Sequence, residues 1–92
     1  SLHYSPGIPL RMNVKKPNTG EAFVLIKKRK INFKNYFFLS ESNNLTKAAR
    51  NLYPLIRKIK NKGYKKIAVE KIPNIGIGQT INDRLERASK YK

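Results

Sequence analysis

The chain contains no cysteine and a single histidine, His3, close to its N-terminal end. It therefore has no disulfide framework, no thiol nucleophile and no zinc-finger spacing, and we expect no metal site. No apolar run approaches the roughly 20 residues that a membrane span requires. The first ten residues also lack the apolar core of a signal peptide. These absences predict a cytoplasmic protein that does not enter the membrane.

Acidic residues are scarce as well. Five Asp and Glu stand against 21 Lys and Arg, which gives a formal net charge of +16 on 92 residues. Such an excess is typical of proteins that bind nucleic acids. Codon usage is a second interpretation, because Lys, Asn and Ile have A/T-rich codons and Lys outnumbers Arg 15 to 6. Arg is the better reader of phosphates and bases, so charge alone leaves both interpretations open.

The length allows one small domain with a thin core. Runs of apolar and β-branched residues predict strands, and an apolar spacing of three and four predicts helices. The strands are expected at 8–13, 22–26, 35–39 and 67–69, and the helices at 45–62 and 78–88. We therefore predict an α/β fold with two or three layers: a mixed sheet of about four strands and two main helices. The first two strands are expected to pair antiparallel, because their connection is short.

Local signals define the two helices. Asn44 is a good N-cap for the first helix and Gly63 a good C-terminal glycine, whereas Pro54 should kink the helix. In the last helix, Asp83 and Arg87 stand four residues apart and can form an ion pair. The buried stripe of that helix is expected to consist of Ile77, Ile81, Leu85 and Ala88.

Four basic residues, Lys27-Lys28-Arg29-Lys30, directly follow the apolar run at 22–26, and we single out Lys27, Lys28 and Arg29 among them. They are candidate phosphate contacts. The simpler interpretation is a solvated strand exit or a hairpin turn.

The stretch from 67 to 88 reads as strand, Pro/Gly loop and helix, the order with which α/β domains build phosphate sites. Gly76 and Gly78 lack the third glycine of a dinucleotide fingerprint and the lysine of a P-loop, which favours a turn that packs the helix closely. Asn82, Asp83 and Arg84 form a compact polar triplet. It is a candidate ligand site, or else it holds a loop or an interface.

These segments together resemble a known family. The run Ile72-Pro73-Asn74, the Gly76-Ile77-Gly78 turn and Ile81-Asn82-Asp83-Arg84-Leu85 look like the end of the two-domain threonylcarbamoyl-AMP synthases, the long members of the YrdC-like family. Ala48-Ala49-x-Asn51-Leu52-Tyr53 is similar to the preceding helix of their C-terminal domain. His3-Tyr4-Ser5-Pro6 resembles the end of their interdomain linker, although Ser5-Pro6-Gly7 also matches an earlier part of that linker.

The resemblance implies a Rossmann-like accessory domain at 8–92, with residues 1–7 as the end of the linker. The family enzyme makes threonylcarbamoyl-AMP from threonine, bicarbonate and ATP for tRNA modification. Its catalytic residues lie in a YrdC-like domain that this chain lacks. By resemblance the chain is therefore non-catalytic and has no cofactor of its own, since ATP would bind only the catalytic domain. The implied partner is that domain, in the same polypeptide or in another, with tRNA as a further candidate.

The same resemblance implies that His3 and Tyr4 of the linker contact the active site of a complete enzyme. Two other functions remain open from the residues themselves. One is an autonomous basic RNA-binding module. The other is a nucleotide-binding domain that uses the turn at Gly76 and Gly78 together with Asn82, Asp83 and Arg84.

Overall fold

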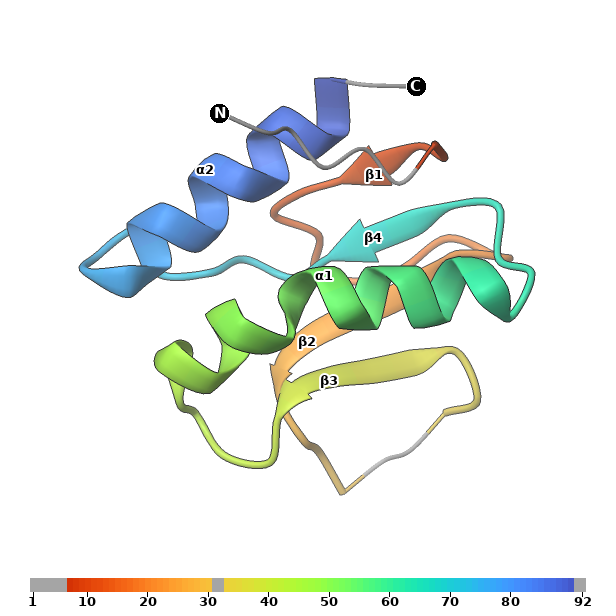
Figure 1. Cartoon of the computed structure of the whole chain (residues 1–92). Coiled ribbons are helices and arrows are strands. Elements are labelled where there is room, and N and C mark those ends of the chain that lie inside the picture. Colours follow the sequence, from red (N-terminus) through yellow and green to blue (C-terminus); the bar gives the residue numbers. More distant parts are fainter. Residues whose placement is uncertain (1–6, 31–32, 91–92) are drawn as a thin grey trace.

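The computed structural model describes residues 7–30 and 33–90. The chain forms four strands and two helices in the predicted order (Figure 1). They are β1 (Leu10–Arg11), β2 (Ala22–Lys27), β3 (Tyr36–Ser40), α1 (Leu45–Asn61), β4 (Ile67–Val69) and α2 (Ile77–Lys90). The predictions for His3, Tyr4 and most of the linker fall outside the described residues. Within them, neither helix has the length and apolarity needed to cross a membrane.

The four strands form one parallel sheet in the order β1-β4-β2-β3. The α/β fold is confirmed, but the expected mixed sheet is wrong, and so is the antiparallel pairing of the first two strands. β4 lies between β1 and β2, with Ile67 beside both Leu10 and Ala22. The β1–β2 connection is long enough to pass β4, and on the way Val14 N donates to Val69 O at 2.9 Å. That crossing keeps β1 and β2 parallel.

One face of the sheet carries both helices. Because successive residues of a strand point to opposite faces, Ala22, Val24 and Ile26 of β2 share a single face. They lie in one buried cluster with residues from both helices, so the domain has two layers. In Figure 1, α1 lies across β2 and β4. The helical part of this cluster consists of Ala48, Leu52, Ile56, Ile59, Ile81, Leu85 and Ala88.

The opposite face of the sheet is buried by its connections. Phe23 and Leu25 of β2 and Ala68 of β4 are almost fully buried there, together with Val14 of the β1–β2 connection. The ring of Tyr36 meets that of Phe23 edge to face, with centroids 5.3 Å apart. Both faces of β2 are therefore covered, as its uninterrupted apolar run predicts.

The limits of α1 agree with the local signals. The side chain of Asn44 accepts a hydrogen bond from Lys47 N at 3.0 Å, which confirms the predicted N-cap. The helix ends at Asn61, and Gly63 follows with a positive φ of 98°. Pro54 lies inside the helix, which continues past it by seven residues. All four strands run parallel and α1 begins soon after β3 ends. The carboxyl ends of the strands and the start of α1 therefore lie at the same edge of the domain.

Candidate functional site

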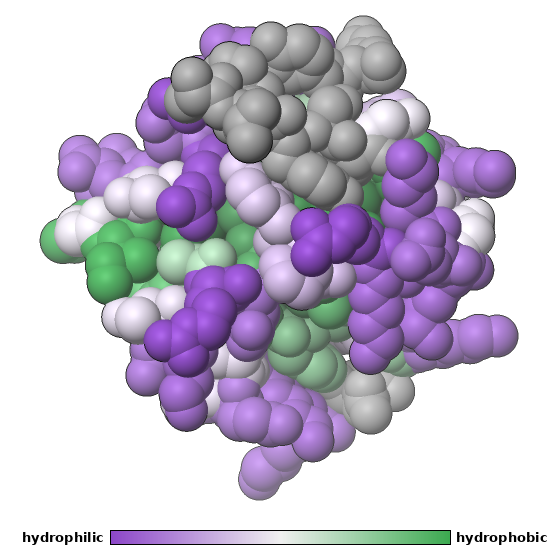
Figure 2. Space-filling model, viewed as in Figure 1, coloured by the Kyte–Doolittle hydropathy of each residue, from purple (hydrophilic) through white to green (hydrophobic). Residues whose placement is uncertain are grey.

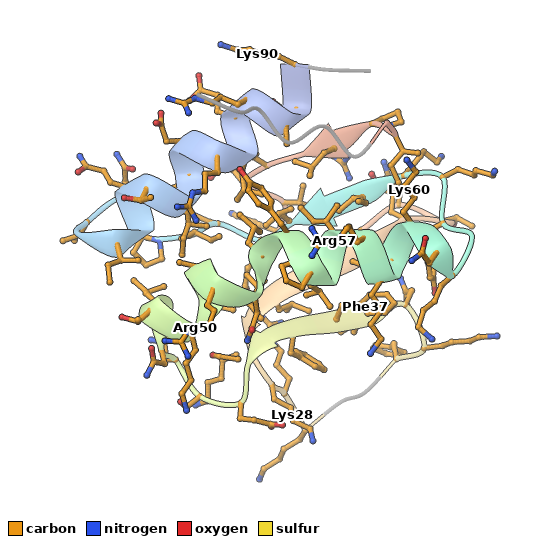
Figure 3. The ribbon with its side chains drawn as sticks, in the orientation of Figure 1. Lys28, Phe37, Arg50, Arg57, Lys60 and Lys90 are labelled. Atoms are coloured by element: carbon orange, nitrogen blue, oxygen red, sulfur yellow. The ribbon has the colours of Figure 1, made fainter. Side chains whose placement is uncertain are left out.

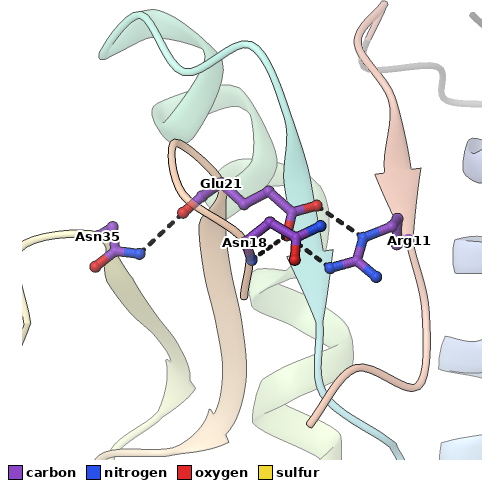
Figure 4. A network of polar contacts seen from close by, with 4 residues as sticks. All are labelled: Arg11, Asn18, Glu21 and Asn35. Carbon is purple, nitrogen blue, oxygen red and sulfur yellow. Dashed lines mark hydrogen bonds and ion pairs between the residues drawn. The ribbon is translucent and has the colours of Figure 1, made fainter. Parts of the chain in front are cut away.

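A polar network closes the amino end of the sheet (Figure 4). The Arg11 guanidinium donates from Nε to Glu21 Oε2 at 2.8 Å and from Nη2 to Oε1 at 2.7 Å. Asn18 N also donates to Oε1 at 2.7 Å, and Asn35 Nδ2 donates to the backbone oxygen of Glu21 at 2.9 Å. Glu21 is only 3% exposed. The hydrogen bonds from Arg11 hold the pKa of this carboxyl below its usual range.

This network was not predicted from the sequence. One signal was available, because Glu21 directly precedes an apolar strand, where a carboxylate must be paired to be buried. Its partners come from three different segments, so their identity could not be read locally. All these donors converge on Glu21, and the Glu21 side chain is nearly inaccessible to solvent. The network therefore has a structural role: it links β1, β2 and β3.

At the other end of the sheet, β2 and β4 separate. Glu70 N donates to Val24 O at 2.9 Å, the last backbone bond between these two strands. The next β2 amide, Ile26 N, donates instead to the side chain of Glu70, at Oε2 and 2.7 Å. The carboxylate thus takes the place of a backbone acceptor, and the chain is free to leave the sheet toward α2.

An open cleft of about 740 Å³ lies where the two strands separate, and we call it the carboxyl-end cleft. The strands that border it leave in opposite directions, because β2 leads outward to β3 whereas β4 leads to α2, which contacts β1. Such a switch point at carboxyl ends is where open α/β sheets bind ligands. The lining residues are Ile26, Lys27, Lys28, Arg29, Lys30, Asn43, Glu70, Lys71 and Pro73.

The three predicted phosphate contacts all line this cleft. Arg29 donates from Nη2 to Glu70 Oε1 at 2.8 Å, and Lys28 Nζ lies 3.9 Å from the Glu41 carboxylate. Lys27 is the exposed last residue of β2. The structure adds Lys71, which follows β4 and is far away in sequence. Only the parallel neighbourhood of β2 and β4 brings it beside the other bases.

The Gly76–Gly78 turn packs the start of α2 against the preceding loop. A Cβ on Gly78 would lie 1.8 Å from Pro73 O, so no larger residue fits without moving the backbone. Gly76 takes a φ of 56°, which glycine adopts without strain. Two amides of the turn are already used: Gly78 N donates to Ile75 O at 3.0 Å, and Gln79 N to Gly76 O at 3.1 Å. This geometry is that of a turn that packs α2 against the loop. Because two of its amides are already hydrogen-bonded, it leaves few N–H donors for a phosphate.

The prediction that Ile77 belongs to the buried stripe of α2 is wrong. Ile77 is 42% exposed, and the buried residue at this turn is Gly78. The close approach of Gly78 to Pro73 fixes the rotation of the helix and turns position 78 to the core. Ile81, Leu85 and Ala88 are buried as predicted.

The side chains of Asn82, Asp83 and Arg84 diverge. Asn82 Nδ2 donates to Ile72 O at 2.9 Å and lies 3.3 Å from Asn74 Oδ1, so it holds the loop before α2. Asp83 accepts from Arg87 at 3.3 Å, as the spacing predicts. The Arg84 guanidinium lies over the Tyr53 ring, 5.9 Å from its centroid. The structure therefore does not bring the triplet together around one ligand.

A shallow depression near the turn also lacks the charge that a phosphate needs. Its described lining holds two carboxylates, those of Asp83 and Glu86, and no basic residue. Carboxylates repel a phosphate, so this depression does not favour the predicted nucleotide site. Among the described residues, no group of three or more His, Cys, Asp or Glu could hold a metal ion.

A parallel four-stranded sheet with two helices on one face and a cleft at its carboxyl edge defines a small Rossmann-like α/β domain. The family model described as the C-terminal domain of threonylcarbamoyl-AMP synthase matches residues 1–90, and the chain belongs to this family.

A solved structure shares the fold. The crystal structure of P. abyssi Sua5 complexed with L-threonine is similar with a TM-score of 0.70 and 23% sequence identity. The match covers 97% of this chain and 30% of that chain, so this chain spans less than a third of the Sua5 length. No curated protein matches the chain.

Proposed function

We propose that this chain is an accessory domain that assists or regulates a YrdC-like catalytic domain, in the same polypeptide or as a separate chain. The observation that carries the proposal is the family match over residues 1–90. The joint activity is the formation of threonylcarbamoyl-AMP for the threonylcarbamoyladenosine modification of tRNA, in the cytoplasm. In this proposal ATP binds the catalytic domain, and the accessory domain has no catalytic residue and no cofactor.

The engagement of the carboxylates supports a non-catalytic role. Asp83 and Glu86 are the acids nearest the family motif, and each is next to a base, Arg87 at 3.3 Å and Lys90 at 3.8 Å. The other three acids of the chain are also paired, with Arg11, Lys28 and Arg29. Each carboxylate therefore already faces a cation of the chain, and we expect none of them to act on a substrate as a general acid or base.

Two exposed apolar side chains, which we call the Ile75/Ile77 knob, support docking to the catalytic domain. Ile75 and Ile77 flank Gly76 and are 77% and 42% exposed. Figure 2 shows an apolar area at the left of the molecule, where Figure 1 places the loop before α2. The Gly78–Pro73 contact and the bonds of Asn82 hold this loop in place. The proposed occupant is the catalytic domain, because a solved relative is more than three times as long as this chain.

The test is to add the chain to a separately expressed YrdC-like domain from a two-domain synthase. Calorimetry measures binding, and the release of pyrophosphate measures ATP-dependent adenylate formation. The double variant Ile75→Ser/Ile77→Ser should weaken binding at least about tenfold, because two large apolar side chains leave the interface.

The matched control is Phe33→Ser. Phe33 is 55% exposed and apolar, but it precedes β3 at the amino end of the sheet, so its loss should leave binding unchanged. The proposal fails if the native chain neither binds nor changes adenylate formation. An equal loss of binding in Phe33→Ser would show that the Ile75/Ile77 knob is not the docking surface.

A further inference from the structure

We propose that the carboxyl-end cleft binds the phosphodiester backbone of a nucleic acid without reading its bases. This inference goes beyond the proposed function and does not depend on it, since it concerns a different surface from the Ile75/Ile77 knob. Four features of the described residues carry it: the charge of the cleft, the way one of its bases is held, the basic surface that continues onto α1, and the composition of the cleft walls.

The cleft gathers bases from two strands. Lys27 ends β2 and Lys28, Arg29 and Lys30 follow it, while Lys71 lies after β4, so five cations surround one opening. Glu70 is the one acid among the described lining residues. Its two oxygens are already occupied by Arg29 and by the backbone amide of Ile26. With five cations and one carboxylate, the lining carries a net positive charge, which attracts an anion.

Arg29 is held before any ligand arrives. Its Nη2 bond to Glu70 fixes the guanidinium at the cleft wall, while the side chain stays 53% exposed. A guanidinium has five N–H donors, and most of them remain available to phosphate oxygens. A base positioned in this way loses less side-chain entropy on binding than a free surface lysine.

The basic surface continues from the cleft onto α1. Asn43 lines the cleft just before this helix, so the first turns of α1 begin beside it. In Figure 3, Lys28 lies at the bottom of the molecule and Arg50 at its lower left. Two acids, Glu41 and Glu70, pair with the cleft bases Lys28 and Arg29, and the other three pair with Arg11, Arg87 and Lys90. None of the five pairs with a base of α1, which itself contains no acid. The basic residues of α1 are Lys47, Arg50, Arg57, Lys58 and Lys60.

The walls of the cleft select a backbone over a mononucleotide. None of its described lining residues is aromatic, so a base has no ring on which to stack. Asn43 is the one uncharged polar side chain among them that could bond a base edge. Phosphates are then the groups that the five cations of the cleft contact best, and a polymer offers several along a basic path. A single nucleotide makes too few phosphate contacts on this surface to bind it tightly.

Two variants that remove equal charge test the proposal. Lys27→Gln/Lys71→Gln removes one positive charge from each side of the cleft. Lys65→Gln/Lys66→Gln is the matched control, because these residues precede β4 and lie at the opposite end of the same strand. All four residues are exposed, so both variants should fold, and their denaturation curves check this.

Fluorescence anisotropy then measures the Kd for two labelled RNAs and one DNA strand of equal length and different sequence. At about 150 mM salt the native chain should bind all three alike. The cleft variant should bind about tenfold more weakly, and its plot of log Kd against log salt should be shallower by roughly 1 to 2. The control variant should stay within about twofold of the native chain.

Three results would overturn the proposal. Equal losses in the two double variants would mean diffuse attraction by net charge. Binding that disappears by about 100 mM salt would mean the same. Displacement of the RNA by millimolar ATP, lost in the cleft variant, would make the cleft a mononucleotide site.

Discussion

The two arginine–glutamate pairs at opposite ends of the sheet use the same chemistry for different purposes. At the amino end, Arg11 donates two bonds to Glu21, whose side chain is 3% exposed. At the carboxyl end, Arg29 bonds Glu70, whose side chain is 19% exposed, and four more bases line the same cleft. Residue type alone therefore does not distinguish a structural pair from a candidate site.

What separates the two pairs is the balance of partners around them. Glu21 receives the side chain of Arg11 and the amide of Asn18, so a buried charge is fully compensated. Glu70 also has its own partners, but it is outnumbered by cations that the sheet holds together. We infer that the amino end stabilises the fold and that the carboxyl end attracts a ligand. Substitutions at and near the two ends of the sheet test this difference.

The largest effect is expected from Gly78→Ala, which tests whether the loop behind the carboxyl end is rigid. The added Cβ would meet Pro73 O at 1.8 Å, and a backbone atom cannot simply rotate away. We expect a loss of about 3 kcal/mol of unfolding free energy, measured by urea denaturation.

Gly76→Asn is the control for this clash. At Gly76 no described atom lies within 4 Å of the added Cβ, and Asn tolerates a positive φ. Its loss should stay below about 1 kcal/mol. A similar small loss for Gly78→Ala would show that the loop yields.

The next effect directly compares the two pairs. Glu21→Gln removes the charge that Arg11 and Asn18 bind, and we expect a loss of about 2 kcal/mol. This is less than for a fully buried pair, because the Arg11 side chain is 46% exposed. Glu70→Gln keeps an acceptor for Ile26 N and should lose no more than about 1 kcal/mol. Equal losses would break the distinction between the two ends.

The pH dependence of stability should follow Glu21. Its pKa is lowered in the folded state, so its contribution is complete above the unfolded-state pKa of about 4.3. The contribution is lost as the pH falls through the lower, folded-state pKa. The difference in unfolding free energy between the native chain and Glu21→Gln should therefore shrink from neutral pH to about pH 3. A difference that does not change with pH would mean that Glu21 contributes without its charge.

The smallest effect separates two neighbours on α2. Asn82→Ala removes the bond to Ile72 O and should lose about 1 kcal/mol. Asp83→Asn breaks an exposed ion pair with Arg87 and should change the unfolding free energy by less than about 0.5 kcal/mol. If Asp83→Asn proves the more damaging change, Asn82 does not hold the loop.

The elements of the fold could be predicted from the sequence because their signals are local. The run at 22–26, the cap at Asn44 and the spacing of Ile81, Leu85 and Ala88 each depend on residues a few positions apart. Strand order is not local, and the insertion of β4 between β1 and β2 was missed for this reason. The exposure of Ile77 was missed because a contact between Gly78 and Pro73 sets the helix rotation.

The candidate site shows the same limit. Lys27, Lys28 and Arg29 were found as a run, but Lys71 joins them only through the pairing of β2 with β4. The role of Glu70 as a substitute backbone acceptor has no sequence signal. The identity of the family was carried by the Ile81-Asn82-Asp83-Arg84-Leu85 run, although its three polar side chains act separately.

The most direct test of the difference between the two ends is an NMR titration of the ¹⁵N-labelled chain with a short RNA. We expect amide shifts at Lys28–Lys30, Asn43 and Lys71 along the carboxyl-end cleft, and no shifts at Asn18–Glu21 and Lys65–Lys66. Shifts centred on the amino end, or spread evenly over all the basic residues, would contradict it.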